Sequence, residues 1–119
     1  MADNLMKVSI QDKAGGIKLV FVKGEVDLST SPGLRSKILE LFKGETPKTI
    51  LIDLQEVVHM DSSGIATLVE GLQASRKNNS AFVLCGVAGV VKSVFEIANL
   101  DKVFEIYENQ DAALSAITK

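Results

Sequence analysis

The chain is poor in the residues on which most metal, redox and nucleic-acid sites depend. It has one cysteine, one histidine, one tyrosine and no tryptophan. A single cysteine cannot form an internal disulfide, and together with one histidine it cannot supply a transition-metal cluster. The formal net charge is −2, whereas nucleic-acid-binding domains usually carry a basic stripe with stacking aromatics. The sequence therefore predicts no metal, no cofactor and no direct contact with nucleic acid, and we expect Cys85, which lies in an apolar run, to be a buried free thiol.

Long apolar runs are also missing. No stretch approaches the roughly 20 residues that a membrane-spanning helix needs, and the N-terminus lacks the charged and then apolar pattern of a signal peptide. We therefore expect no membrane segment and a cytoplasmic location. Hydrophobic residues make up 46% and charged residues 24% of the 119 residues. This composition is typical of one globular domain over residues 1–119 with a single core.

The spacing of apolar residues predicts the order of the elements. Alternation over 7–11 and a second run over 17–22 predict a hairpin, and Ser31 with Pro32 is expected to provide the N-cap and first residue of a helix. The nearly continuous apolar run 49–54 predicts a central strand covered on both faces. Later segments predict, in order, a helix over 63–78, a strand over 81–85, a helix over 90–99, a strand over 103–107 and a helix from Asn109 or Gln110.

The predicted fold is therefore an α/β domain with the order β-β-α-β-α-β-α-β-α. Its sheet has five strands and is mixed but mostly parallel, with an N-terminal β-hairpin and about four helices. Two adjacent strands without a helix between them begin the fold, which separates it from domains that begin β-α-β.

The stretch from Asp53 to Ile65 is where we expect the functional site. After Gly64, apolar residues recur at helical spacing, so a helix begins here. Asp61 and Ser62 are its N-cap candidates, because a short side-chain oxygen accepts an otherwise unpaired backbone N–H of the first turn. Ser62 and Ser63 thus stand at the start of an amphipathic helix. The spacing alone favours a capping role for the two serines over a functional one.

Other polar residues have simple structural explanations. Glu25 and Asp27 are solvated carboxylates at the end of a strand. His59 lies too close in sequence to Asp61 and the serines to form a hydrolase triad, and no Gly-x-Ser-x-Gly elbow is present. We expect it to be a loop histidine without a catalytic role. No nucleophile with an adjacent base is found, so we predict no catalytic residues and no enzyme.

Three segments together resemble the STAS family, and specifically its stand-alone bacterial anti-sigma factor antagonists. The first is the stretch Met60-Asp61-Ser62-Ser63-Gly64-Ile65. The others are Gly24-Glu25-Val26-Asp27, which resembles the family's early Gly-Glu-hydrophobic-Asp segment, and Phe82 to Gly86 followed by Val91 to Leu100, which resemble its later strand and helix.

This resemblance implies a STAS-like single domain and a regulatory binding module. It implies that the unphosphorylated protein binds an anti-sigma factor serine kinase and thereby releases a sigma factor, and that phosphorylation of Ser62 abolishes binding. A serine phosphatase would then act on the phosphorylated form. The partner-binding residues that the resemblance implies are Glu25, Asp27, Asp61, Ser62, Ser63 and Gly64.

Two alternatives belong to other functional classes. The same fold could serve as a docking subunit of a transporter or stress-signalling complex, although the intact Asp-Ser-Ser-Gly favours a phosphorylated antagonist. A receiver-like domain could accept a phosphoryl group on Asp53 at the end of the central strand. Receivers, however, carry an acidic pair after their first strand and begin β-α-β, which this sequence does not.

Overall fold

The computed structural model describes residues 6–118, and their elements follow the predicted order. The hairpin, the three crossover helices and the C-terminal helix all occur as expected, with one short 3-10 helix added before the last strand. The elements are β1 (Met6–Lys13), β2 (Ile17–Val26), α1 (Ser31–Glu40), β3 (Thr49–Met60), α2 (Ser62–Lys77), β4 (Ala81–Cys85), α3 (Gly89–Ile97), η2 (Leu100–Lys102), β5 (Glu105–Tyr107) and α4 (Gln110–Ile117).

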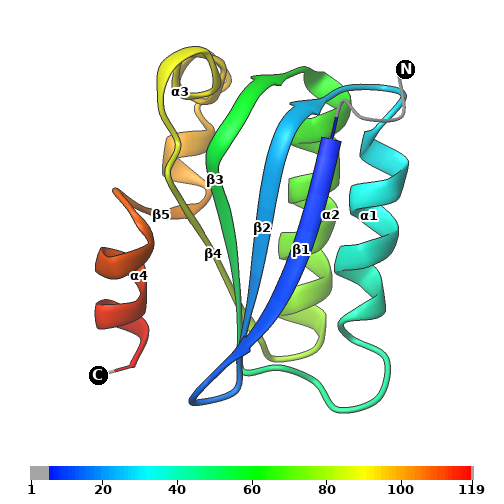
Figure 1. The fold of residues 1–119 in the computed structure, drawn as a ribbon, viewed down its shortest axis with the longest axis vertical. Helices are drawn as coiled ribbons and strands as arrows, with labels where there is room; N and C mark the ends of the chain where they lie inside the picture. The colour runs from blue at the N-terminus through cyan, green and yellow to red at the C-terminus, as the bar shows by residue number, and fades with distance from the viewer. Residues whose placement is uncertain (1–5, 119) are drawn as a thin grey trace.

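The five strands form one sheet in the order β1-β2-β3-β4-β5. Strands β1 and β2 are antiparallel, and every later pair is parallel. Each crossover moves one strand in the same direction, and such connections are right-handed, so the connecting helices gather on one face. Figure 1 shows α1 and α2 side by side on that face and α4 on the opposite one. The predicted α/β class with a mixed, mostly parallel sheet is confirmed.

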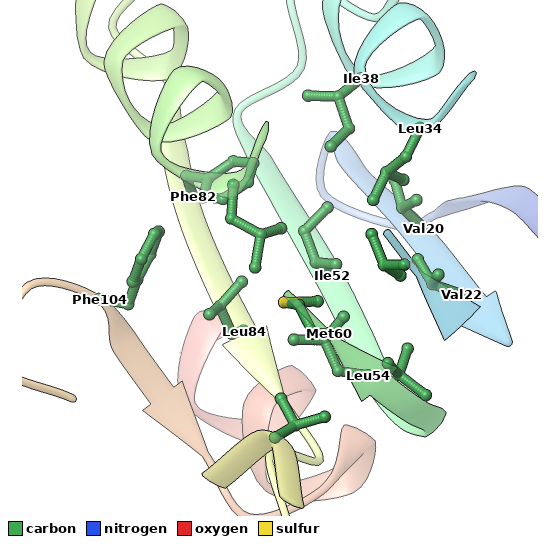
Figure 2. Close-up of a cluster of buried hydrophobic side chains, with 14 of the residues drawn as sticks. Val20, Val22, Leu34, Ile38, Ile52, Leu54, Met60, Phe82, Leu84 and Phe104 are labelled. Atoms are coloured by element: carbon green, nitrogen blue, oxygen red, sulfur yellow. The ribbon is translucent and has the colours of Figure 1, made fainter. Parts of the chain in front are cut away.

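The sheet is covered unequally on its two faces. The larger core lies under the crossover helices, and Figure 2 shows side chains from β2, β3, β4 and α1 meeting there. A smaller cluster lies beneath α4 and includes Leu51, Val83, Cys85 and Ala113. The central strand β3 contributes to both clusters, as its nearly continuous apolar run predicts. Cys85 is fully buried and free, which confirms the predicted buried thiol.

Strand β3 is longer than the sequence predicts. Its pairing with β4 ends at Asp53, but its pairing with β2 continues to Met60 through two register shifts. Several residues in this extension are polar and exposed because only one neighbouring strand remains, so the hydrophobic pattern does not reveal the strand. His59 consequently lies in a strand and not in a loop.

Two further boundaries differ from the prediction. Helix α1 begins at Ser31, so its N-cap is Thr30 and not Ser31. Strand β5 begins at Glu105 and not at Val103, because α3 is followed by a left-handed residue, Asn99, and by the extra turn η2 before the chain enters the sheet.

Candidate functional site

The predicted site residues come together at the carboxyl ends of β2 and β3. Glu25 pairs with His59 and Val26 pairs with Met60 in the parallel ladder. Beyond the ladder, the backbone N–H of Asp61 donates to the carbonyl oxygen of Val26 at 3.1 Å. The Glu25–Asp27 segment and the serine turn are therefore direct neighbours, although Asp27 and Asp61 are 34 positions apart in the sequence.

Asp61 is the N-cap of α2, as predicted. Its backbone is extended, with φ −105° and ψ −170°, which suits an N-cap residue. One carboxylate oxygen, Oδ1, accepts hydrogen bonds from the backbone N–H groups of Ser63 at 2.9 Å and Gly64 at 3.3 Å. The same oxygen accepts the hydroxyl of Ser63 at 2.6 Å. The turn is thus held by a single oxygen atom.

The two serines differ in what their hydroxyls do. The Ser63 hydroxyl is committed to Asp61. Ser62 is the first residue of α2, and its side chain is exposed. Within the part of the chain that the structure describes, the Ser62 hydroxyl has no hydrogen-bond partner. Of the pair, Ser62 offers the free nucleophile.

Gly64 fixes how the start of α2 sits on the sheet. It is buried, and a Cβ at this position would lie 2.7 Å from Cγ of Met60 and 2.8 Å from Cγ1 of Val26. Real Cβ atoms do not approach other carbons so closely, so only glycine lets the helix start pack against the ends of β2 and β3. The position supports the serine turn from behind, and direct contact of Gly64 with a partner stays a prediction.

Asp27 organises a second turn with the same hydrogen-bond pattern. Its Oδ1 accepts the backbone N–H of Ser29 at 3.0 Å, the hydroxyl of Ser29 at 2.8 Å and the backbone N–H of Thr30 at 3.1 Å. The hydroxyl of Thr30 donates to the carbonyl oxygen of Glu25 at 2.9 Å. This use of the Thr30 hydroxyl explains why it does not cap α1.

The edge of the sheet at these turns is acidic. The hydrogen bond from the Ser63 hydroxyl lowers the pKa of Asp61 below its ordinary value. Backbone N–H groups that donate to the same carboxylate lower it further. The Ser29 hydroxyl and the backbone N–H groups of Ser29 and Thr30 likewise lower the pKa of Asp27. Hydrogen bonds to the charged form cause both shifts. The carboxylates of the two neighbouring turns, Asp61 and Asp27, therefore stay ionised at neutral pH, and Glu25 lies at the end of β2.

Sequence reasoning missed two apolar residues at this end of the sheet. Leu28 is 78% exposed and Val58 is 67% exposed. Leu28 follows Asp27 directly, and Val58 lies in the extension of β3. The signal that could have found Leu28 is an aliphatic residue inside an Asp-x-Ser-Thr turn, where polar residues are usual.

Asp53 does not fit the receiver-like alternative. Its side chain is only 2% exposed, and both of its oxygens are bonded, to the backbone N–H of Gln55 at 2.9 Å and to the side-chain amide of Gln110 at 2.7 Å. A phosphoryl donor could not reach it without displacing α4.

Neither a metal cluster nor a spanning helix is found in residues 6–118. No three His, Cys, Asp or Glu side chains gather there in an arrangement that could hold a metal ion. None of the helices there combines the length and the apolar character that crossing a membrane requires.

Comparisons with known proteins agree with this geometry. Residues 10–113 match the STAS domain family. An anti-sigma-B factor antagonist of Listeria monocytogenes is 34% identical over 87 residues, which cover 73% of this chain and 75% of the relative. One of Staphylococcus aureus is 28% identical over 106 residues, covering 89% and 94%. The crystal structure of an anti-sigma factor antagonist from Mycobacterium paratuberculosis has a TM-score of 0.86 at 26% identity and covers 96% of this chain and 95% of that chain.

Proposed function

This chain belongs to the STAS domain family, and from that membership and the geometry at Ser62 we propose that it is an anti-sigma factor antagonist switched by phosphorylation. In its unphosphorylated form it binds an anti-sigma factor serine kinase, which frees a sigma factor. Phosphorylation of Ser62 ends the binding. A serine phosphatase restores the binding form. The relatives named as anti-sigma-B factor antagonists support the first part of this proposal.

The observation that carries the proposal is the different state of the two adjacent hydroxyls. Ser62 is exposed and free of hydrogen bonds from residues 6–118, whereas Ser63 is bonded to Asp61 at 2.6 Å. In the transfer step, Ser62 Oγ forms a bond to the γ-phosphorus of ATP on the kinase, and the bond from that phosphorus to the ADP oxygen breaks. The hydroxyl proton leaves to a base or to solvent. This chain contributes the nucleophile and the rigid turn that presents it.

The helix start explains how the domain tolerates the modification. A phosphoserine carries about −1.5 to −2 charges at neutral pH. The first residue of α2 lies at the positive end of the helix dipole, which favours an anion, so we expect the domain to stay folded.

Phosphorylation would instead weaken the binding of a docked partner. The partner would have to cover a dianion that stands beside the ionised side chains of Asp61 and Asp27. The dianion would lose its water shell at the interface, which is costly, so the phosphorylated form dissociates.

The test combines mass spectrometry with binding measurements. The protein is incubated with ATP, Mg²⁺ and the purified anti-sigma factor kinases of its source organism, and the modified residue is located by mass spectrometry. We expect phosphate on Ser62, none in a Ser62→Ala variant, and normal labelling in Ser115→Ala, a control at an exposed serine of α4. Calorimetry should show that Ser62→Asp weakens kinase binding about tenfold or more, because a charge that is buried at an interface without a matched partner is strongly unfavourable.

Two results would contradict the proposal. One is phosphate on a residue other than Ser62 in the wild-type protein. The other is equal binding of wild type and Ser62→Asp, which would instead favour a constant docking role in a larger complex.

A further inference from the structure

The turns at Asp27 and Asp61 are built in the same way. Each has an aspartate, one intervening residue and a serine whose backbone N–H and hydroxyl both donate to Oδ1 of the aspartate. In each, the next backbone N–H also donates to that oxygen. The intervening residue is the one that points outward. It is Ser62 in the second turn and Leu28 in the first, and both are exposed.

The two turns also touch. Asp61 N–H donates to the carbonyl oxygen of Val26 at 3.1 Å, two residues before Leu28. The Ser63 hydroxyl is the main cause of the lowered pKa of Asp61, and the backbone N–H of Leu28 contributes to the same shift. Leu28 therefore stands beside the phosphoacceptor turn, although it comes from a distant part of the sequence.

The Leu28 side chain is apolar and exposed, so covering it would gain the free energy of burying a leucine. It is 78% exposed, and it belongs to neither of the two hydrophobic clusters. Its backbone is held by the hydrogen bonds of the Asp27 turn and by strand β2, so covering Leu28 costs side-chain rotamer freedom but little backbone freedom. An exposed leucine on a hydrogen-bonded turn offers apolar area that a pocket on a partner can bury.

The charges around Leu28 indicate what kind of surface would cover it. Asp27 precedes Leu28, Asp61 faces its backbone, and Glu25 lies on the same strand end. Residues 27–30 and 61–64, which form the two turns, include no lysine or arginine. A complementary partner would offer an apolar pocket for the leucine with lysine or arginine side chains around it.

We propose that Leu28 is the specificity-determining anchor of this protein, inserted into an apolar pocket that basic side chains border on the serine kinase that phosphorylates Ser62. The inference rests on the function proposed above and goes beyond it. The kinase contacts two chain segments at once, through Leu28 of the β2–α1 turn and Ser62 of the β3–α2 turn. Leu28 selects the partner, and Ser62 receives the phosphate.

The test compares three variants against a purified anti-sigma factor serine kinase of the source organism that labels the wild-type protein. Leu28→Ala removes the anchor, and Leu28→Met keeps its volume and apolar character. Ile97→Ala is the matched control, because Ile97 is 84% exposed but lies on α3, outside both turns. Dissociation constants are measured by calorimetry, and kcat and KM are measured for phosphorylation. Thermal unfolding checks that each variant keeps the wild-type midpoint.

We expect Leu28→Ala to raise Kd and KM about tenfold or more, since each buried CH₂ that is lost weakens binding about fourfold. Because the lost contact is the same in the ground and transition states, kcat should stay unchanged. Leu28→Met and Ile97→Ala should stay within about twofold of wild type, a margin below the loss of one CH₂.

Wild-type labelling at Ser62 with Leu28→Ala within twofold of wild type would overturn this inference alone. A drop in kcat with unchanged KM would also overturn it, because it would indicate a displaced serine and not a lost anchor. If no kinase labels wild-type Ser62, the proposed function fails first and the inference falls with it.

Discussion

The backbone N–H of Asp61 donates to the carbonyl oxygen of Val26 at 3.1 Å, which ties the end of β3 to the end of β2 beyond their regular ladder. On one side of this bond stands the serine turn and on the other the Asp27 turn. The surface proposed for partner recognition is therefore composed of two chain segments. Changes that loosen either turn should affect binding as well as stability.

Gly64 gives the sharpest test of the packing behind the serine turn. A Cβ in Gly64→Ala would meet Met60 Cγ at 2.7 Å and Val26 Cγ1 at 2.8 Å. We expect a loss of about 1–3 kcal/mol in the free energy of unfolding, because overpacking outweighs the better helix propensity of alanine. Urea denaturation followed by circular dichroism measures the change.

Gly33 provides the control for this substitution. It occupies the third position of α1, as Gly64 does in α2, and the nearest atom to its added Cβ is Met6 Cε at 3.9 Å. Gly33→Ala should therefore be neutral or slightly stabilising. Equal losses for Gly33→Ala and Gly64→Ala would show that close packing at Gly64 is not the cause.

Removing the cap of α2 should destabilise the domain without altering its core. Asp61→Ala leaves the backbone N–H groups of Ser63 and Gly64 without their acceptor, which typically costs about 0.5–2 kcal/mol. Asp61→Asn keeps an acceptor oxygen and should lose less. Thermal unfolding ranks the three proteins, and a ranking with Asn below Ala would contradict the capping role.

The aspartates of the two turns, Asp61 and Asp27, should also give the domain a defined acid sensitivity. Hydroxyl and amide donors lower the pKa of Asp61 and of Asp27 from the ordinary value of 3.8. A lowered folded pKa means that the stabilisation is complete above the ordinary value and is lost as the pH falls through the folded value. The double variant Asp61→Asn with Asp27→Asn should therefore show a shallower decline in stability between about pH 4 and pH 2. Parallel curves for variant and wild type would argue against these shifts.

Cys85 should be inert while the domain is folded. Burial, followed by the nearby Asp53, raises the pKa of its thiol to about 12, and the thiolate is the form that reacts. At pH 8 we expect no labelling by a disulfide-exchange reagent in buffer and complete labelling in concentrated urea, followed by absorbance. The rate at intermediate urea should track the unfolded fraction. Fast labelling in buffer would contradict the burial.

The features predicted correctly from sequence are those with local causes. A cap acts over two or three residues, so the sequence narrows the helix starts to Asp61 or Ser62 and to Asn109 or Gln110. The structure places the N-caps at Asp61 and Asn109, whose side chains accept backbone N–H groups of the first turn. The order of strands and helices follows from apolar periodicity for the same reason. Only the family resemblance groups Glu25 and Asp27 with the serine turn in one binding site. The structure places these segments next to each other.

The features missed depend on contacts between distant segments. The extension of β3 to Met60 is held by β2 alone and carries exposed polar residues, so it has no hydrophobic period to detect. The position of Leu28 beside Asp61 is set by the pairing of distant segments, which no local pattern encodes. The same holds for Asp53, which the sequence presents as a strand-end acid and the structure buries beneath α4.

The link between Asp53 and Gln110 should make that buried acid a measurable part of the fold. Gln110, the first residue of α4, donates its side-chain amide to Asp53 Oδ2 at 2.7 Å. Gln110→Ala leaves a buried carboxylate oxygen without this partner, which costs about 1–3 kcal/mol or more when the group is charged. Ser115→Ala, at an exposed position of the same helix, is the control and should change little.

A double-mutant cycle separates this hydrogen bond from general damage to α4. If the bond matters, Gln110→Ala should cost much less in an Asp53→Asn background, because a neutral amide suffers less than a carboxylate from losing a partner. Hydrogen exchange should report the loss first in α4, since that helix is held to the sheet mainly by the small cluster around Ala113 and by this bond. Equal costs in both backgrounds, with exchange in α4 unchanged, would mean that Gln110 contributes nothing to holding the helix against the sheet.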